Sequence, residues 1–499
     1  MRILIDTNIL IAREDHKQID AEIIEFQRLV NVHSISVCVH PLSIEDIHRD
    51  KDEQRRKIIL SKVKSYSLLN NYPDYRLDHD FNDLVGTPDK INTEIDNQIL
   101  YALYKNAIDF LVTQDVKLRK KARQFQLEER VLSIQEINAH LHNIFKETEI
   151  TVPREIIHVE FYSLNLKDPF FDDLRKDYPD FNEWFNTKSK DGKKAWVYKK
   201  LNGSLGAFCA WKEEDQAIDA NPPLPEKRRL KISTLKVDYQ GFKIGELFLK
   251  MAFQYAIEKG IDEIYLTHFI KENDRLMELI EDFGFQHASV KNGEFYYIKN
   301  LLPPDKNAYT LKPYYPSLRT GYDVGKFIVP IQPQYHKRLF PEFDILYSRN
   351  TDQQLLFQPE IKMATEGNTI KKAYLCHSNI KQIKMNDILI FYRSSDIMAL
   401  TSIGVVDSVH RRKLNPEDIL HLVSKRTVYT YEEIIEIAKR PTLVLIFRWH
   451  FYFKQPIFYS DLMRRNILIA APQSITQIEH SKFEDIIKLG GLNERYLFN

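Results

Sequence analysis

The chain has 499 residues, of which 43% are hydrophobic and 28% charged, and its formal net charge is +1. This length exceeds what one hydrophobic core usually serves and indicates about three domains. The near-neutral charge excludes a whole-chain electrostatic argument for nucleic-acid binding, so any basic surface must be local. The cysteines Cys38, Cys209 and Cys376 stand far apart without metal-ligand spacing, which indicates a reducing compartment and excludes a disulfide scaffold.

No apolar run in the sequence approaches the roughly 18 residues that a membrane span needs. The nearest candidate, PTLVLIFRWHFYF (441–453), is interrupted by Arg448 and His450. The apolar stretch at the amino terminus is short and runs directly into Asp6, unlike a signal peptide. The sequence therefore predicts a cytoplasmic protein without a membrane partner.

Residues 1–145 alternate short apolar strands with helical patterns, which predicts a parallel α/β sheet. Asp6 follows the strand RILI and Asp115 follows the strand FLVTQ, so parallel pairing brings both carboxylates to the same sheet edge. Glu45 and Asp96 lie in helical stretches between these strands. Taken one at a time, each acid is equally consistent with a helix cap or a solvated surface position.

Taken in order, the motif DTN, a helical Glu, a helical Asp and the motif TQD resemble the PIN nuclease family over residues 1–145. The resemblance implies a parallel α/β/α sandwich that cleaves RNA or, less often, DNA. Crowded carboxylates repel one another, and a divalent cation reverses that repulsion. The implied catalytic residues and ligands of Mg²⁺ or Mn²⁺ are Asp6, Glu45, Asp96 and Asp115, with Asp46 as the alternative to Glu45. The residues implied to orient a carboxylate or a water are Thr7, Asn8 and Thr113.

Residues 150–300 change character. A hairpin candidate, AWVYKKLNGSLGAFCAW, turns at Asn202 and Gly203, and VDYQGFKIGELFLKMAFQYAIEKG (237–260) joins a strand to a long helix. A glycine-containing turn at a helix N-terminus presents unpaired N–H groups and the positive end of the helix dipole, which suit a pyrophosphate. By itself this signal is weak, because many α/β turns contain two glycines.

QGFKIG, followed by the strand EIYLTHF and the helix NDRLMELIEDFGF, resembles the GNAT acetyltransferase family over residues 150–300. The resemblance implies a mixed sheet that binds acetyl-CoA. The residues implied to bind the coenzyme are Val237, Gln240, Gly241, Phe242, Lys243, Ile244, Gly245 and Asn273. There are two departures, since Lys243 replaces the usual central glycine of the loop and Ile280 replaces a tyrosine that many members use as general acid. Transfer would then need another proton donor, such as Tyr265, Tyr296 or a water.

Residues 301–325 are rich in proline and tyrosine and are interpreted as a linker, and residues 326–499 are mostly strands, which predicts a small β-barrel. Because of its segment 373–409, this region resembles the PUA-like superfamily, which includes the ASCH and EVE domains, over residues 326–499, and the resemblance implies RNA binding. Between residues 371 and 455 there are 14 Lys and Arg against 8 Asp and Glu. The candidate RNA-binding residues are Ser378, Arg393, Ser394, Arg411, Arg412 and Arg448. The alternative is that the nearby aromatic residues are core and the cations a solvated face.

The leading hypothesis is a multidomain α/β and α+β protein that acts on RNA, for example tRNA or mRNA. It combines a metal-dependent endoribonuclease, an N-acetyltransferase domain that binds acetyl-CoA, and an RNA-binding domain. A toxin or defence role with an antitoxin-like protein partner also fits. Two alternatives stay open: an acetyltransferase of protein or small molecules with a scaffold PIN domain, and a non-catalytic RNA-binding regulator that senses acetyl-CoA. Metal binding would argue against the scaffold, and Ile280 favours the regulator.

Overall fold

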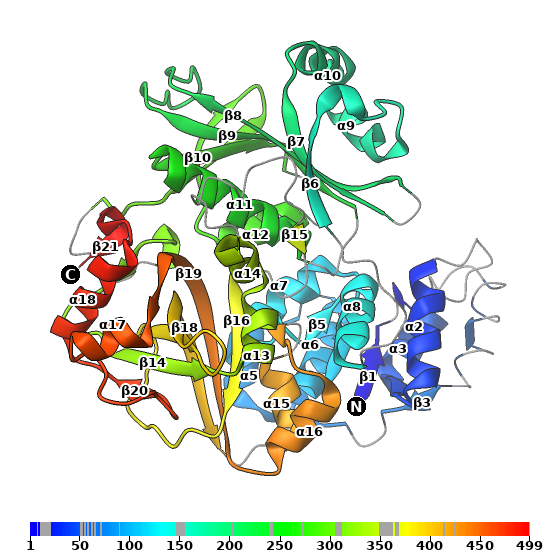
Figure 1. The fold of residues 1–499 in the computed structure, drawn as a ribbon. Coiled ribbons are helices and arrows are strands. Elements are labelled where there is room, and N and C mark those ends of the chain that lie inside the picture. The colour runs from blue at the N-terminus through cyan, green and yellow to red at the C-terminus, as the bar shows by residue number, and fades with distance from the viewer. Residues whose placement is uncertain are drawn as a thin grey trace. The chain divides into compact units, whose positions relative to one another are not determined.

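In the computed structural model the chain forms two compact units, each built from two separate stretches of sequence (Figure 1). Unit 1 contains Met1–Glu147 and Lys413–Lys439, and unit 2 contains Thr148–Arg412 and Arg440–Asn499. The structure describes all residues except 7, 10–20, 50–52, 54–55, 57–58, 61–62, 64–65, 70–71, 89, 146–154, 201–202, 239–242, 271–273, 305–311, 349–362, 365–368, 413–414, 424–425 and 499. Among the described helices, none is long and apolar enough to cross a membrane.

Unit 1 is built on a five-stranded sheet in which every pairing is parallel, in the order β3-β2-β1-β4-β5. Its strands are β1 (Arg2–Ile5), β2 (Ser36–Val39), β3 (Ser67–Leu68), β4 (Phe110–Val112) and β5 (Val131–Leu132). The described helices of the first stretch are α2 (Ala21–Val32), α3 (Pro41–His48), α5 (His79–Val85), α6 (Ile91–Tyr104), α7 (Val116–Gln124) and α8 (Ile134–Phe145). The alternation of strands and helices in the sequence predicts this parallel arrangement, because parallel strands need crossover connections.

The second stretch of unit 1 is a pair of helices, α15 (Pro416–Val423) and α16 (Tyr431–Ala438). It is anchored to the first stretch by an ion pair between His421 Nε2 and Asp109 Oδ1 at 2.6 Å. Arg426 forms a second ion pair with Glu129 at 2.9 Å. These partners lie far apart in the sequence, so the helix pair is part of unit 1 only through the tertiary fold.

Unit 2 contains an eight-stranded mixed sheet in the order β11-β12-β10-β9-β8-β7-β6-β15. Its strands are β6 (Glu155–Glu160), β7 (Lys194–Lys199), β8 (Leu205–Glu214), β9 (Arg229–Val237), β10 (Glu263–His268), β11 (Gln286–Lys291), β12 (Glu294–Asn300) and β15 (Met363–Ala364). All pairs are antiparallel except β9 with β10. One face packs in a core with α11 (Ile244–Lys259) and α12 (Arg275–Asp282), and the other packs over β7 and β8 with α10 (Phe181–Lys190).

A second sheet of unit 2 has six strands in the order β16-β19-β18-β17-β14-β20. They are β14 (Lys326–Ile331), β16 (Lys371–Cys376), β17 (Ile388–Arg393), β18 (Ala399–Arg412), β19 (Thr442–Phe458) and β20 (Thr476–Gln477). The helices of this part are α13 (Pro333–Leu339), α14 (Pro341–Ser348), α17 (Tyr459–Arg464) and α18 (His480–Gly490). Among the described strands no pairing joins β16 to β20, so closure into a barrel stays a prediction.

The two sheets of unit 2 are joined through α11. Lys250 Nζ lies 2.8 Å from Glu342 Oε2, and both side chains are almost completely buried. Glu246 accepts hydrogen bonds from the N–H groups of Ile370 and Lys371 at 2.8 and 3.2 Å. Buried charges are tolerated only when they are paired in this way. Helix α11 is therefore shared by the coenzyme-binding candidate region and the second sheet.

Candidate functional sites

The parallel strands β9 and β10 separate at their carboxyl ends. Their pairing stops at Ile232 opposite Leu266. Beyond that rung, β9 stays paired with β8 as far as Val237, and β10 stays paired with β12 as far as His268. The backbone edges that face each other beyond the last rung are therefore not joined to one another, and such parting at the carboxyl ends of strands is where α/β sheets bind ligands.

Helix α11 begins directly after this parting. Its N-cap, Lys243, is in the left-handed region with φ of 54°, and no side chain caps the helix. The helix starts at Ile244, whose side chain is buried. An α-helix leaves its first N–H groups without an intrahelical partner, and these groups together with the dipole attract an anion. The left-handed conformation at Lys243 explains why glycine is the more usual residue there.

Gly245 has a packing role that the sequence does not reveal. Its φ is not in the left-handed region, yet an added Cβ would lie 2.7 Å from Leu279 Cδ2 of α12. A glycine at this position therefore permits the close approach of α11 and α12. It supports the coenzyme loop by fixing the start of the helix against its neighbour.

Ile280 and the two candidate tyrosines occupy different surroundings. Ile280 is fully buried in the core shared by α11 and α12. Tyr265 donates a hydrogen bond to Glu214, and burial together with this carboxylate raises its pKa. Burial also raises the pKa of Tyr296. Both phenols are thus held in their neutral form, and Tyr265 has already committed its proton to a carboxylate.

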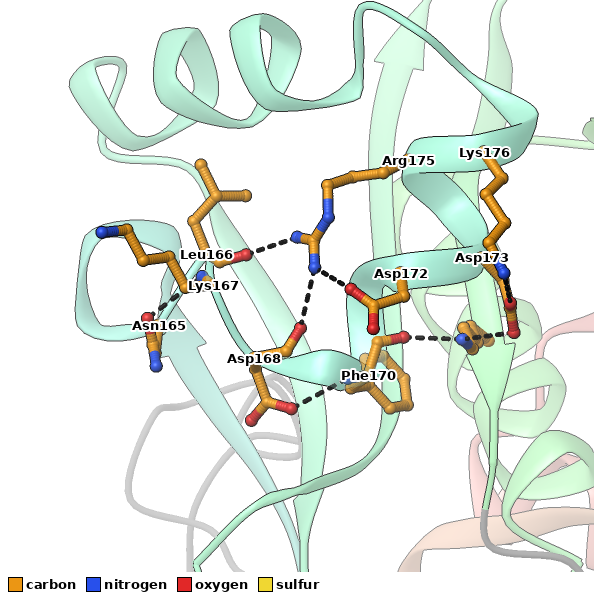
Figure 2. Close-up of polar contacts among 10 residues, drawn as sticks. Asn165, Leu166, Lys167, Asp168, Phe170, Asp172, Asp173, Arg175 and Lys176 are labelled. Carbon is orange, nitrogen blue, oxygen red and sulfur yellow. Dashed lines mark hydrogen bonds and ion pairs between the residues drawn. The ribbon is translucent and has the colours of Figure 1, made fainter.

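Segment 165–176 lies beside β9 and is held together by hydrogen bonds among its own residues (Figure 2). Arg175 donates to the carbonyl oxygens of Leu166 and Asp168 at 2.7 and 3.3 Å. Lys236 of β9 donates to the carbonyl oxygen of Phe170 at 2.6 Å. Segment 165–176, which includes most of α9 (Asp172–Asp177), is thereby attached to β9, the strand that separates from β10.

In unit 1 the carboxyl ends of β1 and β4 bring four polar residues together, as the sequence predicts. Asp6 Oδ2 accepts from Thr113 Oγ1 at 2.6 Å and from Asn8 Nδ2 at 2.9 Å. Thr113 Oγ1 in turn accepts from the N–H of Asp115 at 2.9 Å. Asp115 also caps α7, since its Oδ1 accepts from Lys117 N–H at 2.6 Å. Asp115 is thus both a helix cap and a member of the cluster.

Asp96 is electrostatically coupled to the same cluster. Burial, reinforced by the charges of Asp6 and Asp115, raises the pKa of Asp96 to about 7, and Asp46 adds to this effect. Glu45 is exposed on α3 and does not figure among the charges that act on Asp96. The acid of α3 that faces the cluster is therefore Asp46, the residue that the sequence left as the alternative. A fourth-ligand role for either residue stays a prediction.

The donor chemistry of this cluster fits Mg²⁺ or Mn²⁺, which prefer carboxylate oxygen ligands. The spacing is less favourable. Over the described part of the chain, no group of three or more His, Cys, Asp and Glu side chains is positioned to hold a metal ion.

The predicted RNA-binding residues of the second sheet are largely engaged within the protein. Arg393 is buried and forms ion pairs with Asp344 and Asp396. Arg448 pairs with Asp407 at 2.9 Å. Arg411 Nε donates to the carbonyl of Ile380, Ser394 Oγ donates to that of Ile331, and Ser378 Oγ accepts from the N–H of Ile380. RNA binding here stays a prediction, and these contacts favour a structural role for Arg393 and Arg448.

Several predicted site residues lie outside the described part of the chain. They are Thr7 of the first motif, Gln240, Gly241 and Phe242 of the coenzyme loop, and Asn273. Arg412 ends β18, but its side chain is not described. The three cysteines are free thiols.

Residues 158–285 match the model of the acetyltransferase (GNAT) family. The match covers β6 through α12, and so includes the parting strands and the start of α11. It supports a GNAT domain in this part of the chain. No curated protein matches the sequence.

Three solved structures are similar to parts of the chain. The ASCH protein from Zymomonas mobilis has 10% identity and a TM-score of 0.24, covering 33% of this chain and 94% of its own. A GNAT-family acetyltransferase from Listeria monocytogenes has 17% identity and a TM-score of 0.21, covering 29% and 94%. The NatC complex bound to Gag peptide and CoA has 18% identity and a TM-score of 0.20, covering 30% and 99%. The family match, and not these low scores, supports the proposal below.

Proposed function

We propose that residues 158–285 bind acetyl-CoA and transfer its acetyl group to an acceptor. The observation that carries the proposal is the family match over the parting of β9 and β10. The helix start at Lys243 lies next to that parting and has no side-chain cap. The coenzyme's pyrophosphate would bind at this helix start, and its thioester would lie between the separated strand ends. This is the sequence-based alternative of an acetyltransferase, now supported as a domain assignment.

Calorimetric titration of the full chain with acetyl-CoA tests the proposal. Lys243→Asp places a negative charge at the N-terminus of α11, so it should weaken binding about tenfold, which corresponds to about 1.4 kcal/mol. The matched control is Lys381→Asp, an exposed lysine in the loop between β16 and β17, which should bind as wild type does. Absence of binding by the wild-type chain would refute the proposal, and equal weakening in both variants would remove the helix start from the site.

A second candidate function is metal-dependent cleavage of RNA by unit 1. The observation that favours it is the cluster at the carboxyl ends of β1 and β4, where Thr113 and Asn8 both donate hydrogen bonds to Asp6 and where the charges of Asp6 and Asp115 help to raise the pKa of Asp96. Asp6, Asp96 and Asp115 would hold the cation, with Asp46 as the fourth acid. A bound Mg²⁺ or Mn²⁺ would supply a Lewis acid that lowers the pKa of a water. The residues of this chain would hold the cation, and Asn8 and Thr113 would orient Asp6.

Incubation of total RNA with the full chain and Mn²⁺ or Mg²⁺ tests this second function. Cleavage that both Asp6→Asn and Asp96→Asn abolish would support it. Comparison of Asp46→Asn with Glu45→Gln then decides between the two acids of α3, because only the former should reduce cleavage. A wild-type chain that cleaves neither RNA nor single-stranded DNA, and whose stability does not respond to the cation, would leave unit 1 as a scaffold.

A further inference from the structure

The sheet face opposite α11 carries polar and aromatic residues close to the parting of β9 and β10. Lys231 lies between Leu230 and Ile232, which belong to the core with α11, so alternation points its side chain to the opposite face. Tyr265 lies opposite Lys231 in the register and likewise sits between two core residues of β10. This rung is one residue before the last β9–β10 pair.

Lys231 differs from the other lysine of β9 that faces this side. Among the described residues, the Lys231 amine has no hydrogen-bond or ion-pair partner, and it lies 5.5 Å from the centre of the Tyr265 ring. Lys236, in contrast, donates to the carbonyl of Phe170 and pairs with Asp173 at 3.3 Å. The Lys236 amine is thus bonded to segment 165–176, whereas the Lys231 amine lies beside the Tyr265 ring.

Groups from three other elements surround Lys231. Tyr265 donates to Glu214 of β8, and its ring stacks on that of Tyr296 of β12 at 6.1 Å between centres. Glu294, at the start of β12, accepts a hydrogen bond from Tyr178 OH at 3.1 Å. Tyr178 lies between α9 and α10, so this bond joins the connection between these helices to the β11–β12 hairpin on the same side of the sheet.

We propose that Lys231 accepts the proton of the acceptor amine during acetyl transfer, with Tyr265 as a positioning residue whose ring lies beside this amine near the point where the strands separate. This proposal rests on the acetyltransferase function proposed above. In the step, the amine nitrogen forms a bond to the acetyl carbon and the carbon–sulfur bond breaks. The sulfur leaves with the electron pair as a thiolate, while the proton lost by the amine passes to neutral Lys231. The resulting ammonium can then return that proton to the thiolate.

The electrostatics of the site agree with this role. Burial lowers the pKa of Lys231, which increases the neutral fraction that a base requires. The carboxylates of Glu214 and Glu294 oppose the shift, and the charge of Lys212 adds to it. Tyr265 is a poorer base or acid than Lys231, because its own pKa is raised and its proton is held by Glu214.

Bromoacetyl-CoA provides a test that needs no knowledge of the acceptor. A neutral amine near the acyl group attacks the bromine-bearing carbon, bromide leaves, and the amine's proton passes to solvent. We expect modification of Lys231 in the full chain, mapped by peptide mass spectrometry and suppressed by excess CoA. The rate should rise with pH and reach half its maximum below pH 10.5, the ordinary pKa of lysine. Lys236, whose amine is held, should stay unmodified.

Two variants complete the test. Lys231→Met should lose the modification while keeping the wild-type affinity for acetyl-CoA, and Lys291→Met, an exposed lysine of β11, should behave as wild type. Tyr265→Phe should shift the pH at which the rate is half-maximal, which a merely structural residue would not do. If acetyl-CoA binds but Lys231 is modified no faster than exposed lysines, the proposal is overturned while the acetyltransferase function stands. If acetyl-CoA does not bind, both fail.

Discussion

Replacing Asp96 with asparagine should stabilise unit 1, and the gain should depend on pH. The pKa of Asp96 is raised from 3.8 to about 7 in the folded chain, because the carboxylate is buried beside Asp6 and Asp115. Between these two values the folded state holds a proton that the unfolded state has released. Unfolding therefore releases a proton, and wild-type stability falls as pH rises through this window.

The magnitude follows from the difference in pKa. Each pKa unit corresponds to 1.36 kcal/mol, so the penalty at pH 8 is on the order of 4 kcal/mol. Between pH 5 and pH 8 the advantage of Asp96→Asn over wild type should grow by about 3 kcal/mol, and at higher pH it should stay level. For a unit of this size, that growth is about 6 to 12 °C in melting temperature.

Thermal unfolding of the full chain with a chelator present, at pH 5 and pH 8, measures this difference. Asp83→Asn, an exposed acid of α5, is the matched control and should show no pH-dependent gain. Addition of Mn²⁺ should stabilise wild type and not Asp96→Asn if the cluster binds a cation. An advantage of Asp96→Asn that is the same at both pH values would refute the reasoning, because the carboxylates would then not be coupled.

Three further outcomes are expected from other contacts. Lys250→Met should destabilise unit 2 by about 3 to 5 kcal/mol, because the buried Glu342 loses its cationic partner. The double variant Lys250→Met with Glu342→Gln should have a free energy of unfolding, measured in urea, closer to that of wild type. Gly245→Ala should lower the free energy of unfolding by about 1 kcal/mol, because the added Cβ clashes with Leu279, and it should also weaken acetyl-CoA binding. Adding Leu279→Ala to this variant should restore the acetyl-CoA affinity, as measured by calorimetry. Arg426→Ala should lower the free energy of unfolding of unit 1 by about 1 to 3 kcal/mol and leave that of unit 2 unchanged. If unit 2 were destabilised instead, α15 and α16 would not belong to unit 1.

The cluster of unit 1 illustrates what a sequence can predict about a site. Asp6 and Asp115 each follow an apolar strand, and parallel pairing then places both at one edge without further information. The acid on α3 could not be fixed in the same way. Each helical residue is rotated by about 100° from the last, so Glu45 and Asp46 point in different directions once Pro41 sets the start of α3.

The arginines of the second sheet illustrate the opposite case. A local excess of basic residues indicates a cationic surface only when the charges are exposed. Arg393 and Arg448 instead pair with Asp344 and Asp407, which the fold brings beside them. Counting charges along the sequence could not reveal these pairs, because Asp344 lies on α14 and Asp407 is placed near Arg448 by the pairing of β18 with β19. Lys231 was missed for a similar reason, since a lysine in an alternating strand reads as a solvated face.

The helix pair α15–α16 gives the chain an unusual order of assembly during synthesis. Unit 1 needs Lys413–Lys439, which follow most of unit 2 in the sequence. At about 5 to 20 residues per second, roughly 15 to 60 seconds separate the synthesis of residue 147 from that of residue 439. During that interval Asp109 and Glu129 of the nascent chain lack His421 and Arg426, the partners that are synthesised later. A product released before residue 413 would lack the second stretch of both units.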